Sequence, residues 1–206
     1  MRLLAVLTAA LALAACQKSA TAVSADDMTL GNPKAPVTVV EYASLSCPHC
    51  AAFNNDVFPA FKAKYIDTGK VFWVAREALT ADPALAAAGF LTARCAGKDK
   101  YFQVTDAIYH VPAYHEEGDT NAFEPHATLL TIARGVGLTD AQFETCVRDP
   151  NARKALEDRW NRYVTDDKIE GTPTFVINGK LYNQGEMGMP QLEAAIAQAQ
   201  GGKPAT

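Results

Sequence analysis

The sequence predicts an α/β protein in which an all-helical insertion interrupts a small sheet domain. β-Branched, mostly apolar runs at 37–42 and 71–75 flank a helical pattern, which is typical of two parallel strands joined by a crossover helix. The block that follows lacks strand alternation and is rich in helix formers. Short β-branched segments return near the C-terminal end. We therefore expect a sheet domain at 36–79 and 169–200, with a helical insertion at 80–168.

The N-terminus has the pattern of an export signal. Arg2 precedes an apolar stretch that ends at Ala15 and is too short to span a bilayer. The sequence Leu-Ala-Ala-Cys that ends at Cys16 resembles the lipobox of bacterial lipoproteins. We therefore expect a lipoprotein signal peptide at 1–15, lipidation of Cys16, and a membrane-anchored protein in the periplasm. The residue that follows the lipobox cysteine is Gln17 and not aspartate, which indicates sorting to the outer membrane if the source is a Gram-negative bacterium.

The segment after this cysteine is small and polar. Residues 16–35 end in a sequence rich in Gly and Pro, so we expect a flexible tether between the anchor and the folded domain. The alternative to lipidation is an ordinary signal peptide cut after Ala20 or Ala22, which gives Cys16 no role.

The sequence of residues 36–79, the first part of the sheet domain, predicts a β-α-β unit. Residues 37–42 fit a strand that is buried on both faces. From Cys47 onward, apolar residues recur at helical spacing, with Pro48 suited to the first turn and Pro59 expected to kink the helix. Residues 71–75 form the second strand.

The insertion and the C-terminal end are divided by turn residues. Glycines and prolines break 80–168 into four or five helices, at Gly97, Pro112, Gly135, Gly137 and Pro150. Thr139 to Gln142 has the form of a capping box and should begin the helix that carries Cys146. Further on, Asn178-Gly179 suits a type I′ hairpin turn, and an amphipathic helix closes the chain at 190–199.

Cys47-Pro48-His49-Cys50 begins the predicted crossover helix. Two cysteines three apart at a helix start can close a small disulfide, and the positive end of the helix favours the thiolate of the first. His49 can donate a hydrogen bond to that sulfur. The pattern predicts thiol redox chemistry, with a structural disulfide or half of a metal site as the alternatives. A c-type haem is excluded because Ala51 follows the motif.

The other cysteines support this interpretation. Of the five in the chain, Cys95 and Cys146 remain after the motif and Cys16 are assigned. An exported protein meets an oxidising compartment, so we expect a structural disulfide between them rather than two separate buried thiols. They lack the spacing of a second zinc-ligand pair, and the histidines and acidic residues at 110–126 read as solvated surface, so we expect no metal.

Composition excludes one class of partner. The chain has 206 residues, is 49% hydrophobic and carries a formal net charge of -4. A chain of this length and composition can bury a sizeable hydrophobic core. It lacks the excess of basic residues that binding to a phosphate backbone requires, so we expect no nucleic acid partner.

Taken together, the motifs resemble the thioredoxin fold in its DsbA-like version, over about residues 30–200. Cys-Pro-His-Cys is the active-site sequence of DsbA oxidases, and Glu41, six residues before Cys47, matches the buried acid of that family. The segment from Gly171 to Gly179 looks like the cis-proline strand and hairpin. The best-known DsbA enzymes carry valine before that proline, whereas this chain carries Thr172.

The resemblance implies a role for each residue. Cys47 is exposed and forms a mixed disulfide with a client protein, while Cys50 lies a turn deeper and completes the exchange. Pro173 is in the cis form, and the backbone of Thr172 pairs with an extended client segment. Glu41 accepts a proton from Cys50 through water; pairing of this acid with Arg76 is the alternative, and the two are compatible.

The expected activity is therefore protein disulfide oxidation. The disulfide of the motif would be donated to folding exported proteins that contain cysteines, with no other cofactor, and a membrane oxidase of the DsbB type would restore it. An isomerase or reductase kept reduced by a membrane electron donor is the main alternative, indicated by Thr172. A non-catalytic lipoprotein that binds metal or holds clients is the alternative from another class.

Overall fold

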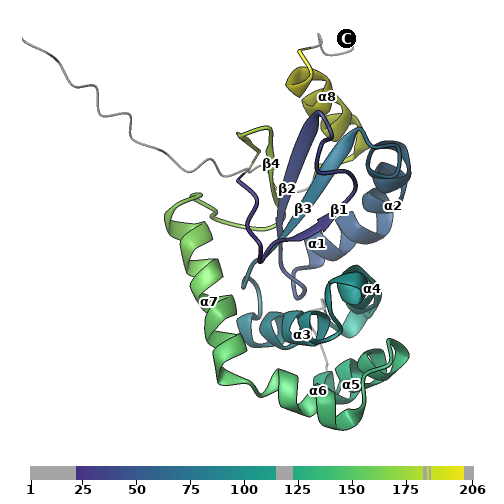
Figure 1. Ribbon diagram of the computed structural model, residues 1–206, viewed down its shortest axis with the longest axis vertical. Helices are drawn as coiled ribbons and strands as arrows, with labels where there is room; N and C mark the ends of the chain where they lie inside the picture. The colour runs from purple at the N-terminus through teal and green to yellow at the C-terminus, as the bar shows by residue number, and fades with distance from the viewer. Residues whose placement is uncertain (1–21, 115–122, 183–184, 186, 202–206) are drawn as a thin grey trace, which may run out of the picture.

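The computed structural model describes residues 22–114, 123–182, 185 and 187–201. Its sheet has the strand order β1-β3-β2-β4-β5 (Figure 1). Strands β2 and β3 are parallel, and every other neighbouring pair is antiparallel. The strands are β1 (Met28–Leu30), β2 (Val37–Ala43), β3 (Val71–Glu77), β4 (Thr174–Ile177) and β5 (Lys180–Tyr182). The predicted β-α-β unit and C-terminal hairpin are both confirmed.

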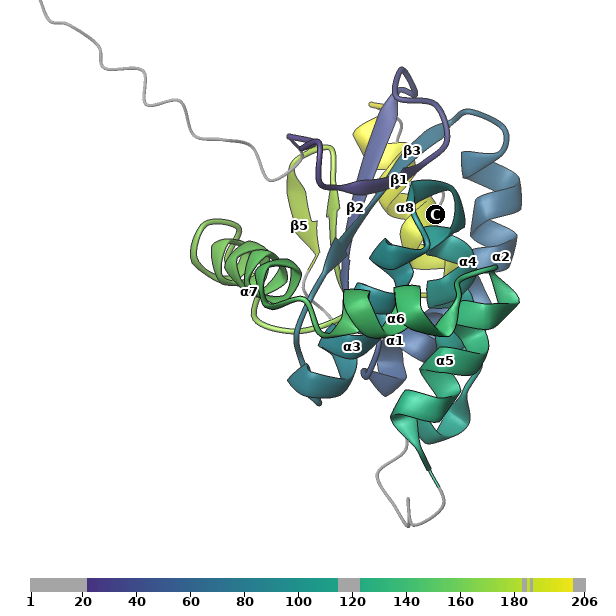
Figure 2. The same cartoon turned by 60° about the horizontal axis from the view of Figure 1, so that its bottom comes forward.

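Helices cover both faces of the sheet and form a separate group beyond its end (Figures 1 and 2). The crossover consists of α1 (Pro48–Ala52), a π-helical segment at Phe53–Val57, α2 (Phe58–Phe61) and a second π-helical segment at Lys62–Ile66. The insertion contains α3 (Pro83–Cys95), α4 (Lys98–Tyr109), a 3-10 turn at Pro112–Tyr114, α5 (Pro125–Gly135), α6 (Asp140–Val147) and α7 (Pro150–Thr165). Helix α8 (Met189–Ala199) closes the described chain.

Each face of the sheet has its own core. Val39 and Trp73 pack with Phe53 of the crossover helix and Leu192 of α8. On the other face, the cluster includes Val40, Val74 and Tyr163, the last from α7. The alternation along β2 thus sends odd-numbered residues toward the crossover helix and even-numbered residues toward α7, as expected for a strand covered on both faces.

The predicted distortion at Pro59 takes a defined form. Proline has no N–H to donate within the helix, and the turn before it widens to a π-helical segment, in which the Phe58 N–H reaches the carbonyl of Phe53. The crossover helix nevertheless continues to Ile66.

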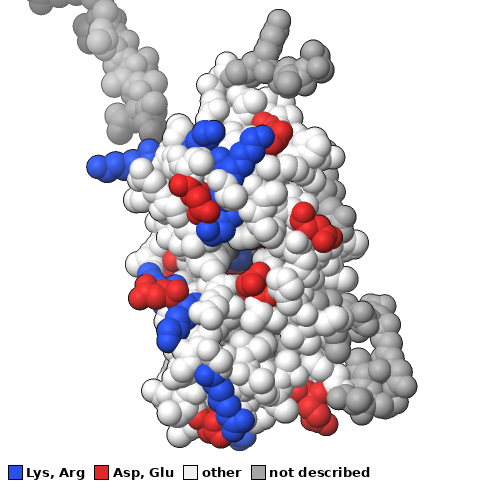
Figure 3. Space-filling model, turned by 90° about the vertical axis from the view of Figure 1, so that its right-hand side faces the viewer, with Lys and Arg blue, Asp and Glu red and all other residues white. Residues whose placement is uncertain are grey.

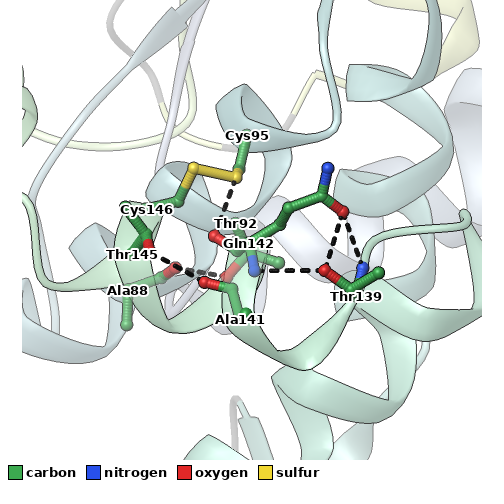
Figure 4. Close-up of a disulfide and its surroundings, with 8 residues drawn as sticks. All are labelled: Ala88, Thr92, Cys95, Thr139, Ala141, Gln142, Thr145 and Cys146. Carbon is green, nitrogen blue, oxygen red and sulfur yellow. Dashed lines mark hydrogen bonds between the residues drawn. A yellow bond between two sulfur atoms is a disulfide. The ribbon is translucent and has the colours of Figure 1, made fainter.

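The insertion is fastened internally by the predicted disulfide. Cys95 at the end of α3 and Cys146 on α6 are joined, and the predicted capping box of Thr139 and Gln142 begins α6 beside them (Figure 4). Closing a loop of this length stabilises the fold by about 4 kcal/mol in the chain-entropy model. The disulfide holds α6 against α3, and α3 starts next to the redox motif.

The predicted tether is wrong in its second half. Residues 28–30 form strand β1, which pairs with β3 and supplies the buried Met28. Asp27 is 5% exposed and forms an ion pair with Arg76. Hydrogen-bonding groups at the edge of β3 and a buried cation therefore order a segment whose small polar composition indicated flexibility. The predicted signal peptide at 1–15 and Cys16 lie outside the described residues.

A second buried ion cluster joins the insertion to the sheet. Glu77 at the end of β3 is 2% exposed and accepts hydrogen bonds from Arg94 of α3 (2.6 Å), Tyr101 of α4 (3.2 Å) and Arg159 of α7 (2.9 Å). One carboxylate therefore connects three helices of the insertion to the sheet.

The surface carries both signs of charge. On the face shown in Figure 3, basic and acidic side chains are interspersed, without a broad basic patch. No helix within the described ranges is long and apolar enough to cross a membrane. Likewise, no group of three or more potential metal ligands occurs in the part of the chain that the structure describes.

Candidate active site

The redox motif lies where β2 ends and the crossover helix begins. Cys47 is the N-cap residue of α1, with an extended backbone (φ -92°, ψ 121°), and Pro48 occupies the first turn. The Cys47 carbonyl accepts the first helical hydrogen bond, from Ala51. This position directs free N–H groups and the positive helix end toward the Cys47 sulfur.

The surroundings of Cys47 stabilise its thiolate. A hydrogen bond from the Cys50 thiol is the main cause that lowers the pKa of Cys47 to about 5; burial opposes it, and the Thr172 side chain and the backbone N–H groups of Cys50 and His49 add to it. The ordinary cysteine pKa is about 8.5, so the thiolate is the dominant form at neutral pH.

Cys50 has the opposite environment. It is 1% exposed, accepts a hydrogen bond from the Ser44 N–H (3.5 Å), and has a pKa held well above its ordinary value, chiefly by burial. The two thiols are unbonded in this structure. One cysteine is thus a stable thiolate and the other a stable thiol, which is the asymmetry that directional exchange requires.

The expectation that Cys47 is exposed is wrong. The residue is only 6% exposed, because it lies against the loop before β4, where its thiol is 3.5 Å from the Thr172 carbonyl oxygen.

That loop holds the predicted cis-proline. The Thr172–Pro173 peptide bond is cis, and Pro173 is buried while Thr172 is partly exposed. The motif and this loop, more than 120 residues apart in the sequence, meet at one sulfur atom.

Glu41 lies on β2 beneath the motif. Burial raises its pKa to about 8, and its charge in turn raises the pKa of Cys50 and of Tyr109. It lines a cavity of about 40 Å³ together with Phe53, Trp73 and Tyr109, which is room for one or a few waters. The effect of its charge on Cys50 makes Glu41 a candidate proton carrier for that thiol.

The alternative pairing of Glu41 with Arg76 is wrong. In the β2–β3 register Arg76 is opposite Tyr42, whereas Glu41 is opposite Ala75. Arg76 therefore points to the other face of the sheet, where it contacts Tyr42 (2.6 Å), Asp27 (3.3 Å) and Asp167 (3.1 Å).

His49 is exposed on the first turn of α1. Its backbone N–H contributes to the low pKa of Cys47. Donation by its imidazole to the sulfur stays a prediction.

Several residues of the site were not predicted. Ser44 and Ser46 flank the end of β2, Thr80 and Asp82 come from the β3–α3 loop, and Tyr109 comes from α4. Each of them takes part in a hydrogen bond with another of these residues, through its side chain or its backbone, and these bonds connect segments that are distant in sequence. Only Ser46, next to the motif, had a position in the sequence that could have indicated its place.

Replacement of Glu41 by glutamine tests its role. We expect exchange at pH 7 to slow by about tenfold, because a neutral amide cannot carry the Cys50 proton. Stability should change as well. The raised pKa of Glu41 means that the folded state keeps a proton which the unfolded state loses above pH 4.5, so wild-type stability falls as pH rises from 4.5 to 8. The variant should lack this fall, roughly 1–2 kcal/mol after allowance for water in the cavity.

Stopped-flow exchange rates and urea unfolding at pH 5, 7 and 8.5 check both effects. An unchanged exchange rate combined with the altered stability profile would leave Glu41 a buried acid without a catalytic role.

Comparisons with known proteins agree with this geometry. Residues 23–198 match the family model described as Thioredoxin. A candidate protein-disulfide oxidoreductase of Rickettsia bellii (strain RML369-C) is 34% identical over 155 residues, which cover 75% of this chain and 58% of that protein. The chain thus spans little more than half the length of such curated relatives.

Solved structures extend the likeness to the whole described fold. The crystal structure of Wolbachia pipientis alpha-DsbA1 superposes with a TM-score of 0.74 at 26% identity, covering 87% of this chain and 93% of that one. Oxidised BdbD from Bacillus subtilis shares the fold, with a TM-score of 0.70 at 20% identity over 85% of this chain and 94% of that one. From the family match, the helical insertion and the arrangement of its cysteine motif against a cis-proline, we conclude that the chain belongs to the thioredoxin family, as a DsbA-like member.

Proposed function

We propose that this protein is an exported protein-disulfide oxidoreductase that donates the Cys47–Cys50 disulfide to folding proteins. The observation that carries the proposal is the contrast between the two thiols: the pKa of Cys47 is lowered to about 5, whereas that of Cys50 is held well above its ordinary value. Stabilising the reduced form in this way makes the oxidised form a strong oxidant.

The exchange occurs in two steps. A client thiolate attacks the Cys47 sulfur of the disulfide, the Cys47–Cys50 bond breaks, and its electron pair leaves on Cys50, which takes a proton. A second client thiolate then attacks the client sulfur of the mixed disulfide and releases Cys47 as a thiolate. The client loses two electrons and the Cys47–Cys50 pair gains them.

Glu41 supplies and recovers the proton in this scheme. With a pKa of about 8, its carboxyl is mostly protonated at pH 7 and can give a proton to the Cys50 leaving group, whose pKa is raised by the charge of Glu41. In the reverse direction, during reoxidation, it accepts the Cys50 proton.

The client is an extended segment that contains cysteine. The route to Cys47 runs beside Thr172, and main-chain pairing with this residue would accept many sequences. A membrane oxidase of the DsbB type is the proposed source of oxidising equivalents.

We place the protein in the periplasm, anchored through a lipid on Cys16. The disulfide between Cys95 and Cys146 supports an oxidising compartment, because such bonds rarely persist in the cytosol. An isomerase or reductase is the second candidate. The observation in its favour is that Thr172 precedes the cis-proline, where the best-known DsbA enzymes carry valine.

A stoichiometric transfer assay separates these functions. Oxidised protein is mixed with an equimolar reduced peptide that carries two cysteines, and both products are followed by mass. The donor role predicts a cyclic oxidised peptide and a reduced enzyme at close to full conversion. If the peptide stays reduced while the reduced enzyme reshuffles a scrambled disulfide protein, the isomerase replaces the oxidase.

A further inference from the structure

Hydrogen bonds through Thr80 connect the two sides of the active site. The Thr80 hydroxyl, in the loop between β3 and α3, is 2.6 Å from the Thr172 hydroxyl. The backbone carbonyl of Thr80 accepts hydrogen bonds from Ser44 and Ser46, each at 3.0 Å. Thr80 therefore joins the loop that leads into Cys47 to the loop that carries the cis-proline.

The direction of the Thr80–Thr172 hydrogen bond follows from proton counting. A hydroxyl has one proton to donate. The Thr172 carbonyl lies 3.5 Å from the Cys47 sulfur, which places this residue beside the thiol. The Thr172 hydroxyl is among the groups that hold the pKa of Cys47 low, an effect that a hydroxyl has when it donates to a thiolate. With its own proton so used, Thr172 must accept the proton of Thr80.

We propose that Thr80 is a positioning residue for thiol–disulfide exchange, which donates to Thr172 and so directs the Thr172 hydroxyl at Cys47. The inference rests on the proposed function and adds to it a residue that touches neither the reacting sulfurs nor the client. Donation by Thr80 also polarises the Thr172 hydroxyl, which strengthens the hydrogen bond that this group makes to the sulfur.

The geometry separates this role from a purely structural one. The contacts of Ser44 and Ser46 are to the backbone carbonyl of Thr80 and persist in any side-chain variant. Among the described residues, the Thr80 hydroxyl has Thr172 as its hydrogen-bond partner. Thr80 is partly exposed, so a substitution of similar shape costs little packing.

The test compares Thr80→Val, which keeps the shape and removes the hydroxyl, with Thr80→Ser, which keeps the hydroxyl. The pKa of Cys47 is read from the pH dependence of iodoacetamide alkylation in the full-length reduced protein. We expect Thr80→Val to raise this pKa by about half a unit, or about threefold in thiolate stability, and Thr80→Ser to restore it. Thr131→Val on α5, whose hydroxyl bonds only within its own helix at the Ala127 carbonyl, is the matched control and should change nothing.

A double-substitution cycle makes the test specific. In a Thr172→Val background, Thr80→Val should produce no further shift, because the route to the sulfur is already absent. The same half-unit shift in that background, or no shift in the single variant, would overturn the proposal. Thr80→Ala replaces the valine variant if circular dichroism shows the latter to be unfolded. These titrations involve no client, so the Thr80 inference and the donor function can fail independently.

Discussion

Cys47→Ser is expected to reduce disulfide transfer to clients by at least about 1000-fold, to the uncatalysed background. The reason is that the client thiolate attacks the Cys47 sulfur of the disulfide in the first step, and Cys47 leaves as a thiolate in the second step. Serine cannot form a disulfide, and no other thiol lies at the helix N-terminus within the described structure except the buried Cys50. Transfer to the two-cysteine peptide, measured at pH 7, checks the loss.

Cys50→Ser is the matched control. It cannot form the disulfide that is donated, so it should also lose transfer. Its Cys47 thiolate can still attack a disulfide of an oxidised client, and without the Cys50 thiol that would release it by forming the Cys47–Cys50 bond, the mixed disulfide should persist on non-reducing gels. Retained activity in Cys47→Ser would instead favour the alternative of a lipoprotein that holds clients without catalysis.

Glu77→Gln is expected to destabilise the fold by about 3 kcal/mol, because it leaves the buried Arg159 and the partly buried Arg94 without their counter-charge. Glu77 is the shared acceptor of Arg94, Arg159 and Tyr101. Arg159 is itself 7% exposed, and its Nε atom already has no partner among the described residues. The loss should appear as a lower urea midpoint with an unchanged slope.

Glu157→Gln is the control for this substitution. Glu157 forms an exposed pair with Arg153 on α7 at 3.6 Å, and such pairs contribute about 0.5 kcal/mol or less. Equal effects of the two substitutions would show that the Glu77 cluster does not hold the insertion to the sheet.

The elements that could be predicted from the sequence are those with a strong local signal. Thr139 and Gln142 form the expected capping box, and Asn178 and Gly179 both adopt the positive φ of a type I′ turn (43° and 86°). Turn and cap chemistry depends on a few adjacent residues, so it survives without knowledge of the tertiary fold. The motif from Cys47 to Cys50 is likewise contained in four adjacent residues.

The features that could not be predicted from the sequence depend on contacts between residues that are distant in sequence. Asp27 is buried where it forms an ion pair with Arg76 on the neighbouring strand, and β1 forms by pairing with the edge of β3. The face to which Arg76 points follows from the β2–β3 register, which no single strand sequence reveals. Thr80 likewise has no local signal, since its importance comes from Thr172, 92 residues away.

The reduction potential of the Cys47–Cys50 pair tests the central claim most directly. It is measured by equilibrating protein that carries Cys16→Ser with glutathione buffers, and the fraction oxidised is read from alkylation and mass. Because the Cys47 thiolate is strongly stabilised, we predict a value near about -120 to -150 mV, in the range of DsbA. A value near about -270 mV, like that of thioredoxin, would contradict the donor role and assign the protein to the reductases.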